Sequence, residues 1–142
     1  MSSTDRRSFL KTAALGAAAT WIQPELGALY ALPAGANLRV GLVGCGRQGR
    51  SILAELAKIE GVSVTAICDT DERRLSSSAR RAPDAKTYAD HKALLEANEV
   101  DAVIVATPTH LHVGPATDAL SAGKHVYCEA PLAHTVEDAQ KI

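Results

Sequence analysis

Residues 38–49 of this 142-residue chain read Leu38-Arg39-Val40-Gly41-Leu42-Val43-Gly44-Cys45-Gly46-Arg47-Gln48-Gly49. The first half is short, apolar and β-branched, which predicts a strand, and the second half is a glycine-rich turn. Apolar residues at helical spacing between Ser51 and Ile59 predict a helix after the turn. A second apolar run, residues 62–68, predicts another strand and ends at Asp69. Strand, glycine turn, helix, strand and acid, in this order, are typical of a dinucleotide-binding site.

Each glycine of the turn has an expected role. Gly44 makes the tight turn, Gly46 lets the backbone approach a pyrophosphate, and Gly49 lets the helix lie close to the strand. The free N–H groups and the dipole at the start of that helix then face the phosphates. We therefore count Arg47 and Gln48, which lie inside the turn, among the cofactor-binding residues. The alternative is a strand-turn-helix unit without a ligand, and the surrounding pattern favours the dinucleotide site.

The acid after the second strand bears on the choice of cofactor. Asp69 lies 20 residues past Gly49, where a carboxylate can accept hydrogen bonds from a ribose. The carboxylate favours NAD over NADP, because it would repel a 2′-phosphate. Arg73 and Arg74 weaken this argument, since a nearby arginine can accommodate the phosphate. We interpret these arginines as a solvated helix face.

Composition places the chain among soluble globular proteins of about one domain. Apolar residues make up 46% of it and charged residues 22%, and its formal net charge of −1 indicates neither nucleic acid nor an anionic membrane as a partner. The three cysteines, Cys45, Cys68 and Cys128, have no spacing that resembles a metal site or a redox pair. We expect buried apolar side chains near the carboxyl edge of a sheet, rather than a catalytic thiol, and no metal site.

The first 36 residues predict an export signal. Arg6-Arg7 followed by Phe9-Leu10-Lys11 resembles the twin-arginine signal, and a weakly apolar run and a small-residue cleavage site at residues 34–36 follow. The alternative is an amphipathic N-terminal helix. We expect an exported, periplasmic or extracellular protein whose partner during export is the twin-arginine machinery. Because free NAD is scarce outside the cytoplasm, we also expect a tightly held cofactor that is recycled in place.

The rest of the chain alternates between helical and strand patterns. This alternation predicts a doubly wound parallel α/β sheet, the Rossmann fold, over residues 37–142. We expect this region to be the amino-terminal part of a longer protein. The further elements are a helix from Asp71 to about Arg81, a strand over 85–88, a helix capped by Asp90, a strand over 100–106, a helix from about His112 to Ala122, a strand over 124–128 and a helix that starts at Thr135.

Three motifs in order extend the pattern beyond a generic nucleotide fold. They are residues 44–49, then residues 106–112 (Ala-Thr-Pro-Thr-His-Leu-His), then residues 123–132 (Gly-Lys-His-Val-Tyr-Cys-Glu-Ala-Pro-Leu). Together they resemble the glucose–fructose oxidoreductase and inositol dehydrogenase family (Gfo/Idh/MocA). The resemblance covers about residues 38–142. It implies an NAD(P)-binding Rossmann domain followed by a second α/β domain, absent from this chain, that binds the substrate and mediates homo-oligomers.

The resemblance also implies site residues and a substrate class. Thr107 and Pro108 would line the cofactor, His112 matches a family histidine, and Glu129 matches a glutamate near the nicotinamide ribose. On the residues alone, His112 could cap a helix and Glu129 could pair with a neighbour. The family implies hydride transfer between bound NAD and a sugar, polyol or related hydroxy compound.

One departure from the family pattern affects the expected chemistry. The usual Glu-Lys-Pro is Glu129-Ala130-Pro131 here, and the lysine, which assists proton transfer, is replaced by a methyl group. No residue of the chain is assigned as the catalytic base. Two alternatives to the dehydrogenase follow: a redox-neutral NAD-dependent glycosidase or lyase, and a non-catalytic dinucleotide-binding protein.

Overall fold

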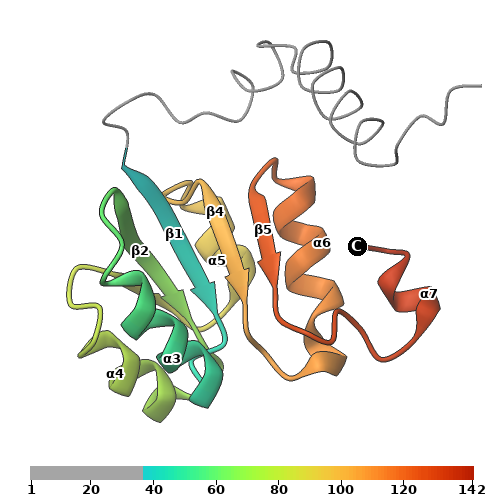
Figure 1. Cartoon of the computed structure of the whole chain (residues 1–142), viewed down its shortest axis with the longest axis horizontal. Helices are drawn as coiled ribbons and strands as arrows, with labels where there is room; N and C mark the ends of the chain where they lie inside the picture. Colours follow the sequence, from blue (N-terminus) through green and yellow to red (C-terminus); the bar gives the residue numbers. More distant parts are fainter. Residues whose placement is uncertain (1–36) are drawn as a thin grey trace, which may run out of the picture. The chain divides into compact units, whose positions relative to one another are not determined.

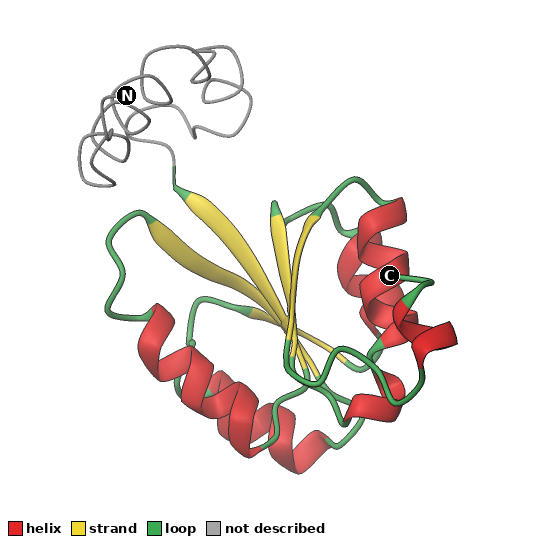
Figure 2. Cartoon of the chain, turned by 45° about the vertical axis from the view of Figure 1, so that its right-hand side comes forward, coloured by secondary structure: helices red, strands yellow, loops and turns green. Residues whose placement is uncertain are grey.

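The computed structural model describes residues 37–142, which form a five-stranded sheet with helices on both faces (Figures 1 and 2). The strand order is β3-β2-β1-β4-β5, and every neighbouring pair is parallel. This is the order of the first five strands of the Rossmann fold, so the predicted doubly wound α/β fold is confirmed. The strands are β1 (Leu38–Val43), β2 (Val62–Cys68), β3 (Lys86–Tyr88), β4 (Ala102–Val105) and β5 (His125–Cys128).

Two pairs of helices cover the two faces, and each pair encloses an apolar cluster (Figure 1). On one face, Leu53 of the first helix packs with Leu42 and Ile67 of the sheet. On the other face, Leu94 and Ala116 pack against the opposite side of the same strands. The helices are α3 (Arg47–Leu56) and α4 (Glu72–Ala79) on the first face, α5 (His91–Glu96) and α6 (Val113–Ser121) on the second, the short α7 (Val136–Ala139) and a 3₁₀ turn, η1 (Thr109–Leu111).

The first helix differs from the prediction at both ends. It begins at Arg47, directly after Gly46, and not at Ser51, because the glycine turn itself delivers the chain into helical geometry. It ends at Leu56, after which the chain turns toward β2 through Gly61 at a φ of +78°. The predicted extension of the helix to Ile59 is therefore wrong, and the Ile59 side chain is 51% exposed.

The register of the sheet aligns the ends of its strands. Val43, the last residue of β1, pairs with Cys68 at the end of β2 and with Val105 at the end of β4. Val105 in turn pairs with Cys128 at the end of β5. The segments that follow these strands therefore meet at one carboxyl edge, although they are far apart in the sequence.

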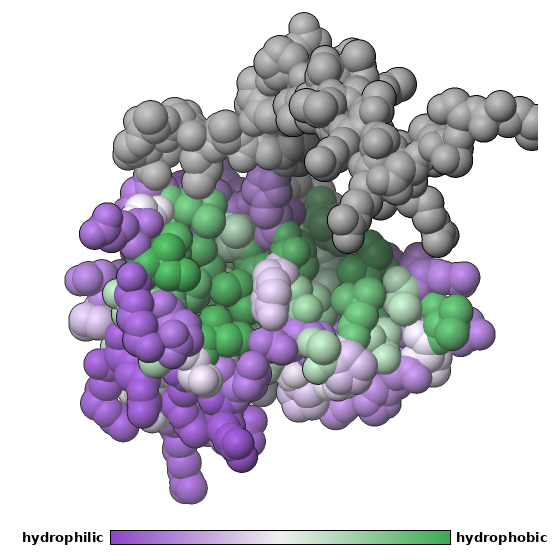
Figure 3. Space-filling model, viewed as in Figure 1, coloured by the Kyte–Doolittle hydropathy of each residue, from purple (hydrophilic) through white to green (hydrophobic). Residues whose placement is uncertain are grey.

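Part of the sheet has no helix over it among the described residues. On the α3 side, Ile104 of β4 is half-buried and its partner Tyr127 of β5 is 57% exposed. Apolar residues gather over the middle of the sheet in Figure 3, which views the molecule from this side.

None of the helices within residues 37–142 is long and apolar enough to cross a bilayer.

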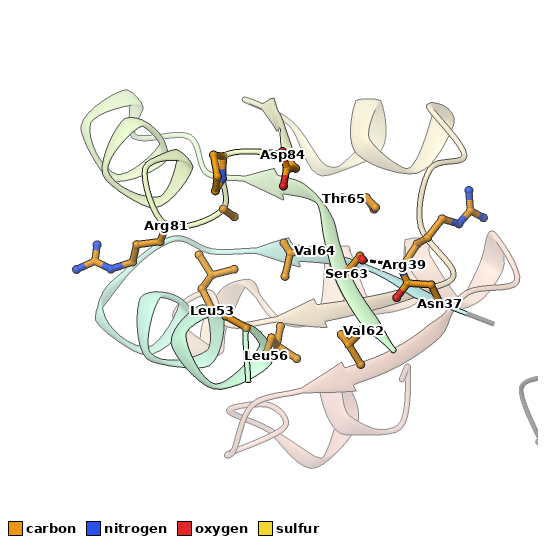
Figure 4. A pocket seen from close by; sticks show the side chains of 13 residues that line it. Asn37, Arg39, Leu53, Leu56, Val62, Ser63, Val64, Thr65, Arg81 and Asp84 are labelled. Carbon is orange, nitrogen blue, oxygen red and sulfur yellow. Dashed lines mark hydrogen bonds between the residues drawn. The ribbon is translucent and has the colours of Figure 1, made fainter. Parts of the chain in front are cut away.

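A hollow of about 510 Å³ lies beside the first half of β2. In Figure 4, Leu53 and Leu56 of α3 approach Val62 and Val64 of β2. Asn37 of the chain entering β1 donates a hydrogen bond to Ser63 at its rim. This hollow extends to the amino ends of β1 and β2, whereas ligands of open parallel sheets bind beyond the carboxyl ends. We therefore look for the functional site at the opposite edge.

Candidate functional site

The glycine turn between β1 and α3 is as tight as its sequence predicts. Gly44 has a φ of +102°, and a Cβ there would lie 2.6 Å from the backbone of Ala106. A Cβ on Gly49 would lie 1.9 Å from the carbonyl oxygen of Gly44, so α3 can pack here only without a side chain. A Cβ on Gly46 would meet nothing within 4 Å. The space above Gly46 is thus open to a ligand that approaches the backbone.

The start of α3 has backbone donors to offer. Gly46 precedes the helix in an extended conformation, and no side chain within the described residues caps this end. The first N–H groups of a helix have no partner within the helix itself. Arg47 and Gln48 lie at this end of α3, beside the open space above Gly46. The arrangement suits an anionic group such as a pyrophosphate.

Asp69 lies next to the glycine turn, where its carboxylate has two backbone partners. One oxygen accepts the N–H of Cys45 at 2.7 Å, and the other accepts the N–H of Asp71 at 2.8 Å. The acid therefore ties the loop after β2 to the turn after β1. Each carboxylate oxygen retains a second lone pair, so Asp69 can still accept a ribose hydroxyl.

Three adjoining hollows follow the carboxyl edge of the sheet. One of about 420 Å³ lies between Asp69, His91 and Leu111, and a second of about 390 Å³ lies above Gly46, between Asp69 and Gln48. A third of about 400 Å³ lies between Gln48, Thr107 and Glu129. Because Thr107 and Pro108 line all three, these hollows form one elongated crevice. Its position between β1 and β4 is where the strand order reverses.

The loop after β4 contributes Thr107 and Pro108 to this crevice. The hydroxyl oxygen of Thr107 is buried and has no hydrogen-bond partner among the described residues. His112 lies beneath this loop, 1% exposed, with its Nε2 2.8 Å from the carbonyl oxygen of Thr107 and its Nδ1 3.2 Å from that of Leu132. His112 therefore connects the loops that follow β4 and β5. Its direct contact with a cofactor stays a prediction.

The loop after β5 brings Glu129 back to the glycine turn. The side-chain amide of Gln48 donates to one oxygen of Glu129 at 3.0 Å, and the N–H of Ala130 donates to the other at 3.3 Å. The methyl group of Ala130 lines the third hollow, where the family pattern has a lysine. All ten residues predicted for the site thus lie at one edge of the sheet, in or directly beside the crevice.

Comparison with known proteins identifies the family. Residues 38–142 match the model of the Gfo/Idh/MocA oxidoreductase family, NAD-binding Rossmann fold. The chain belongs to this family. Inositol 2-dehydrogenase from Salmonella typhimurium (strain LT2) is 37% identical over 108 residues, which cover 75% of this chain and 32% of the relative. The glycosyl hydrolase family 109 protein 2 from Shewanella sp. (strain ANA-3) is 35% identical over an alignment of 163 residues, which covers 97% of this chain and 36% of the relative.

Solved structures agree with this assignment. Myo-inositol dehydrogenase from Lactobacillus casei, in complex with NAD(H) and myo-inositol, superposes with a TM-score of 0.71 at 32% identity, over 74% of this chain and 32% of that protein. The chain spans about a third of the length of the curated relatives it matches. Because this family is defined by an NAD-binding Rossmann fold, the cofactor predicted from Asp69 and the glycine turn is confirmed as NAD.

Two further residues line the crevice of this Gfo/Idh/MocA domain. Arg74, expected on a solvated helix face, lines the two hollows on either side of Asp69. His91 is half-buried, and its ring lies 2.8 Å from Asp118 and 3.3 Å from Asp90. Neither residue belongs to a recognisable sequence motif. Their place at the crevice follows only from the strand order, which brings their segments together.

The cysteines are not reactive groups of the site. Cys45 and Cys68 are buried in different apolar clusters, on opposite faces of the sheet. Burial raises the pKa of the Cys45 thiol to about 11 and that of the Cys68 thiol to about 12, so neither forms a thiolate at neutral pH. Burial also raises the pKa of Cys128, which is only partly covered. The interpretation of Cys45 and Cys68 as buried apolar side chains is confirmed.

Proposed function

We propose that the whole protein is an NAD-dependent oxidoreductase that acts on a hydroxyl-bearing carbon of a sugar, a polyol or a related compound. The observation that carries the proposal is the crevice at the carboxyl edge, which runs from Asp69 across the glycine turn to Glu129. Family membership supports it, as do relatives whose names specify inositol dehydrogenases. Bound NAD supplies the chemistry of a hydride acceptor.

The residues present fit this cofactor. The open space above Gly46 and the uncapped start of α3 suit the pyrophosphate, and Asp69 suits the adenosine ribose. The carboxylate of Glu129 offers a polar partner at the other end of the crevice. We propose that this end holds the nicotinamide half.

Proton transfer is not assigned to any residue among 37–142. Ala130 carries no ionisable group, and both ring nitrogens of His112 lie against backbone carbonyl oxygens. We propose that the catalytic base comes from a second, substrate-binding domain of the complete protein, which would also mediate homo-oligomers. The length of the curated relatives, of which the matched region is only 32–36%, supports this proposal.

The test is a screen of the purified complete protein with NAD and a panel of free inositols and sugars, followed at 340 nm. Steady accumulation of NADH with at least one hydroxy compound is the expected result. If no compound reduces NAD although the protein binds it, the dehydrogenase proposal fails.

A redox-neutral NAD-dependent glycosidase is the second candidate. Two observations favour it: Ala130 replaces the lysine, and relatives named glycosyl hydrolase family 109 protein match 97% of the chain, against 75% for inositol 2-dehydrogenase. One relative, from Shewanella oneidensis, is named alpha-N-acetylgalactosaminidase. Cleavage of an aryl α-N-acetylgalactosaminide without net NADH formation would support this candidate over the dehydrogenase. Binding of NAD with neither activity would instead favour a non-catalytic protein.

We also propose export by the twin-arginine route. Residues 1–36, which include Arg6, Arg7 and the possible cleavage site, lie outside the described residues, so the proposal rests on their sequence. Replacement of both arginines by lysine should retain the precursor in the cytoplasm, which cell fractionation would detect. Normal export of this variant would contradict the proposal.

We propose in addition that NAD is bound before export and travels with the protein. The purified protein should then release NAD only on denaturation, and loss of NAD on simple dialysis would contradict this proposal.

A further inference from the structure

The hydrogen bond between Gln48 and Glu129 joins two elements that are 81 residues apart in the sequence. Gln48 lies in the first turn of α3, and Glu129 directly follows β5. Both side chains line the hollow that we assign to the nicotinamide half, and Gln48 also lines the hollow above Gly46. The bond therefore crosses the crevice at the boundary between its two halves.

The backbone on both sides of this bond is held in place. The N–H of Glu129 donates to the carbonyl oxygen of Val105 at 3.0 Å, which extends the β4–β5 pairing by one residue. Gln48 precedes Gly49, where α3 packs so closely on the turn that a Cβ would lie 1.9 Å from the carbonyl oxygen of Gly44. Both backbone segments are thus positioned by contacts other than the side-chain pair, and the bond itself depends on the rotamers of Gln48 and Glu129.

The carboxylate of Glu129 has few other partners. Within the described residues it accepts two hydrogen bonds, from the amide of Gln48 and from the N–H of Ala130. A carboxylate only accepts, so the Gln48 amide must present its NH₂ group to it. The side chain of Ala130 cannot donate. Gln48 is thus the one described side chain that orients Glu129.

We propose that Gln48 is a positioning residue that holds the Glu129 carboxylate toward the nicotinamide half of the cofactor. The proposal rests on the proposed assignment of that end of the crevice. On this proposal, the part of the NAD affinity that the nicotinamide half contributes depends on the amide of Gln48. It does not depend on Arg47 or on the backbone of the turn. Gln48 acts through Glu129, so its effect disappears when Glu129 is removed.

The test compares NAD with ADP, which contains the adenosine and both phosphates but lacks the nicotinamide riboside. Both ligands are titrated calorimetrically into the complete protein, and the readout is the ratio of the two affinities. Gln48→Ala should lower the NAD-to-ADP ratio by about threefold to tenfold, as expected for the loss of one hydrogen bond to a charged group. ADP affinity itself should change less than about twofold, because the N–H groups of α3 remain.

Two further variants separate positioning from a general effect. Gln48→Met has nearly the same volume and no donor, and it adds no charge beside the phosphates, so it should lower the ratio as much as Gln48→Ala does. Gln140→Ala, at the exposed end of α7, is the matched control and should leave the ratio unchanged.

A double-mutant cycle decides whether Gln48 acts through Glu129. In a Glu129→Ala background, Gln48→Ala should have no further effect on the ratio. An equal effect in both backgrounds, an unchanged ratio for Gln48→Ala alone, or an equal loss of ADP affinity would each overturn the proposal. Failure of the wild-type protein to bind NAD would instead contradict the proposed function itself.

Discussion

The carboxylate of Asp69 accepts the backbone N–H of Cys45, 24 residues earlier in the chain, at 2.7 Å. Its second oxygen accepts the N–H of Asp71, so one side chain connects the glycine turn, the end of β2 and the start of α4. The acid expected at this position as a ribose ligand is therefore also a structural support for the turn that faces the phosphates.

Replacement of Asp69 should affect stability as well as NAD binding. Asp69→Ala leaves two backbone N–H groups without their acceptor and should lower the free energy of unfolding by about 1–3 kcal/mol. Asp69→Asn retains one acceptor oxygen and should fall between the wild type and Asp69→Ala. Urea denaturation and NAD titration on the same samples measure both effects, with Asp84→Ala, in the opposite hollow, as the control. If Asp69→Ala weakens NAD binding but leaves the free energy of unfolding unchanged, Asp69 is a ligand of NAD and does not support the turn.

Two glycines of the same turn should respond differently to alanine. Gly49→Ala places a Cβ 1.9 Å from the carbonyl oxygen of Gly44, so α3 must move away, at a cost of roughly 3 kcal/mol or more. Gly46→Ala meets no atom within 4 Å and should fold normally, yet bind NAD at least about tenfold more weakly, because the methyl group occupies the space of the pyrophosphate. Thermal unfolding and NAD titration distinguish the two. A Gly46→Ala protein with wild-type NAD affinity would remove the pyrophosphate from this position.

The thiols should be protected in the native protein. The pKa values of about 11 for Cys45 and about 12 for Cys68, together with their burial, predict that neither reacts with a chromogenic disulfide reagent at pH 8. Cys128, which is partly covered, should react slowly, and all three should react after denaturation. Rapid reaction of two or more thiols in the folded protein would contradict this prediction.

The ion pair between Arg39 and Asp101 should contribute a pH-dependent part of the stability. Hydrogen bonding from Arg39 lowers the pKa of the Asp101 carboxyl below its ordinary value, although both side chains are more than a third exposed. The contribution is thus complete above the unfolded-state pKa of about 3.9 and is lost as the pH falls through the lower folded-state value. Asp101→Asn should reduce the free energy of unfolding by about 0.5–1 kcal/mol at pH 7. The difference from the wild type should shrink at the acid end, and a constant difference at every pH would contradict an ionic origin.

Most strands and the glycine turn could be predicted because their signals are local. The β-branched run of β1 and the glycines after it contain the information for a strand and a tight turn within a dozen residues. Likewise, Thr135 caps α7 through its side chain, as its position before two acids predicts. Helix ends were less predictable, since Ile59 satisfies the helical spacing but lies beyond the last turn.

Sequence patterns did not predict the contacts between side chains at the site. His91 between two carboxylates and His112 between two carbonyl oxygens each combine residues from different elements. Asp90 illustrates the same limit: it precedes α5, as predicted, but its carboxylate faces His91 and makes no capping hydrogen bond. Asp118 and Leu132 reach these histidines from distant segments, whereas Asp90 pairs with the adjacent His91 in place of the helix N–H groups.

The sequence by itself determined the alternation of strands and helices, the glycine turn and the acid after β2, because periodicity and turn chemistry act over a few residues. The Gfo/Idh/MocA motifs likewise predicted site residues, and these lie in or beside the crevice. Only the tertiary structure decided that Gln48 meets Glu129 and that Asp69 supports the turn. These contacts depend on strand order and register, which place the carboxyl ends of β1, β2, β4 and β5 at one edge. That placement results from burying both faces of the sheet at once, a condition that no short segment contains.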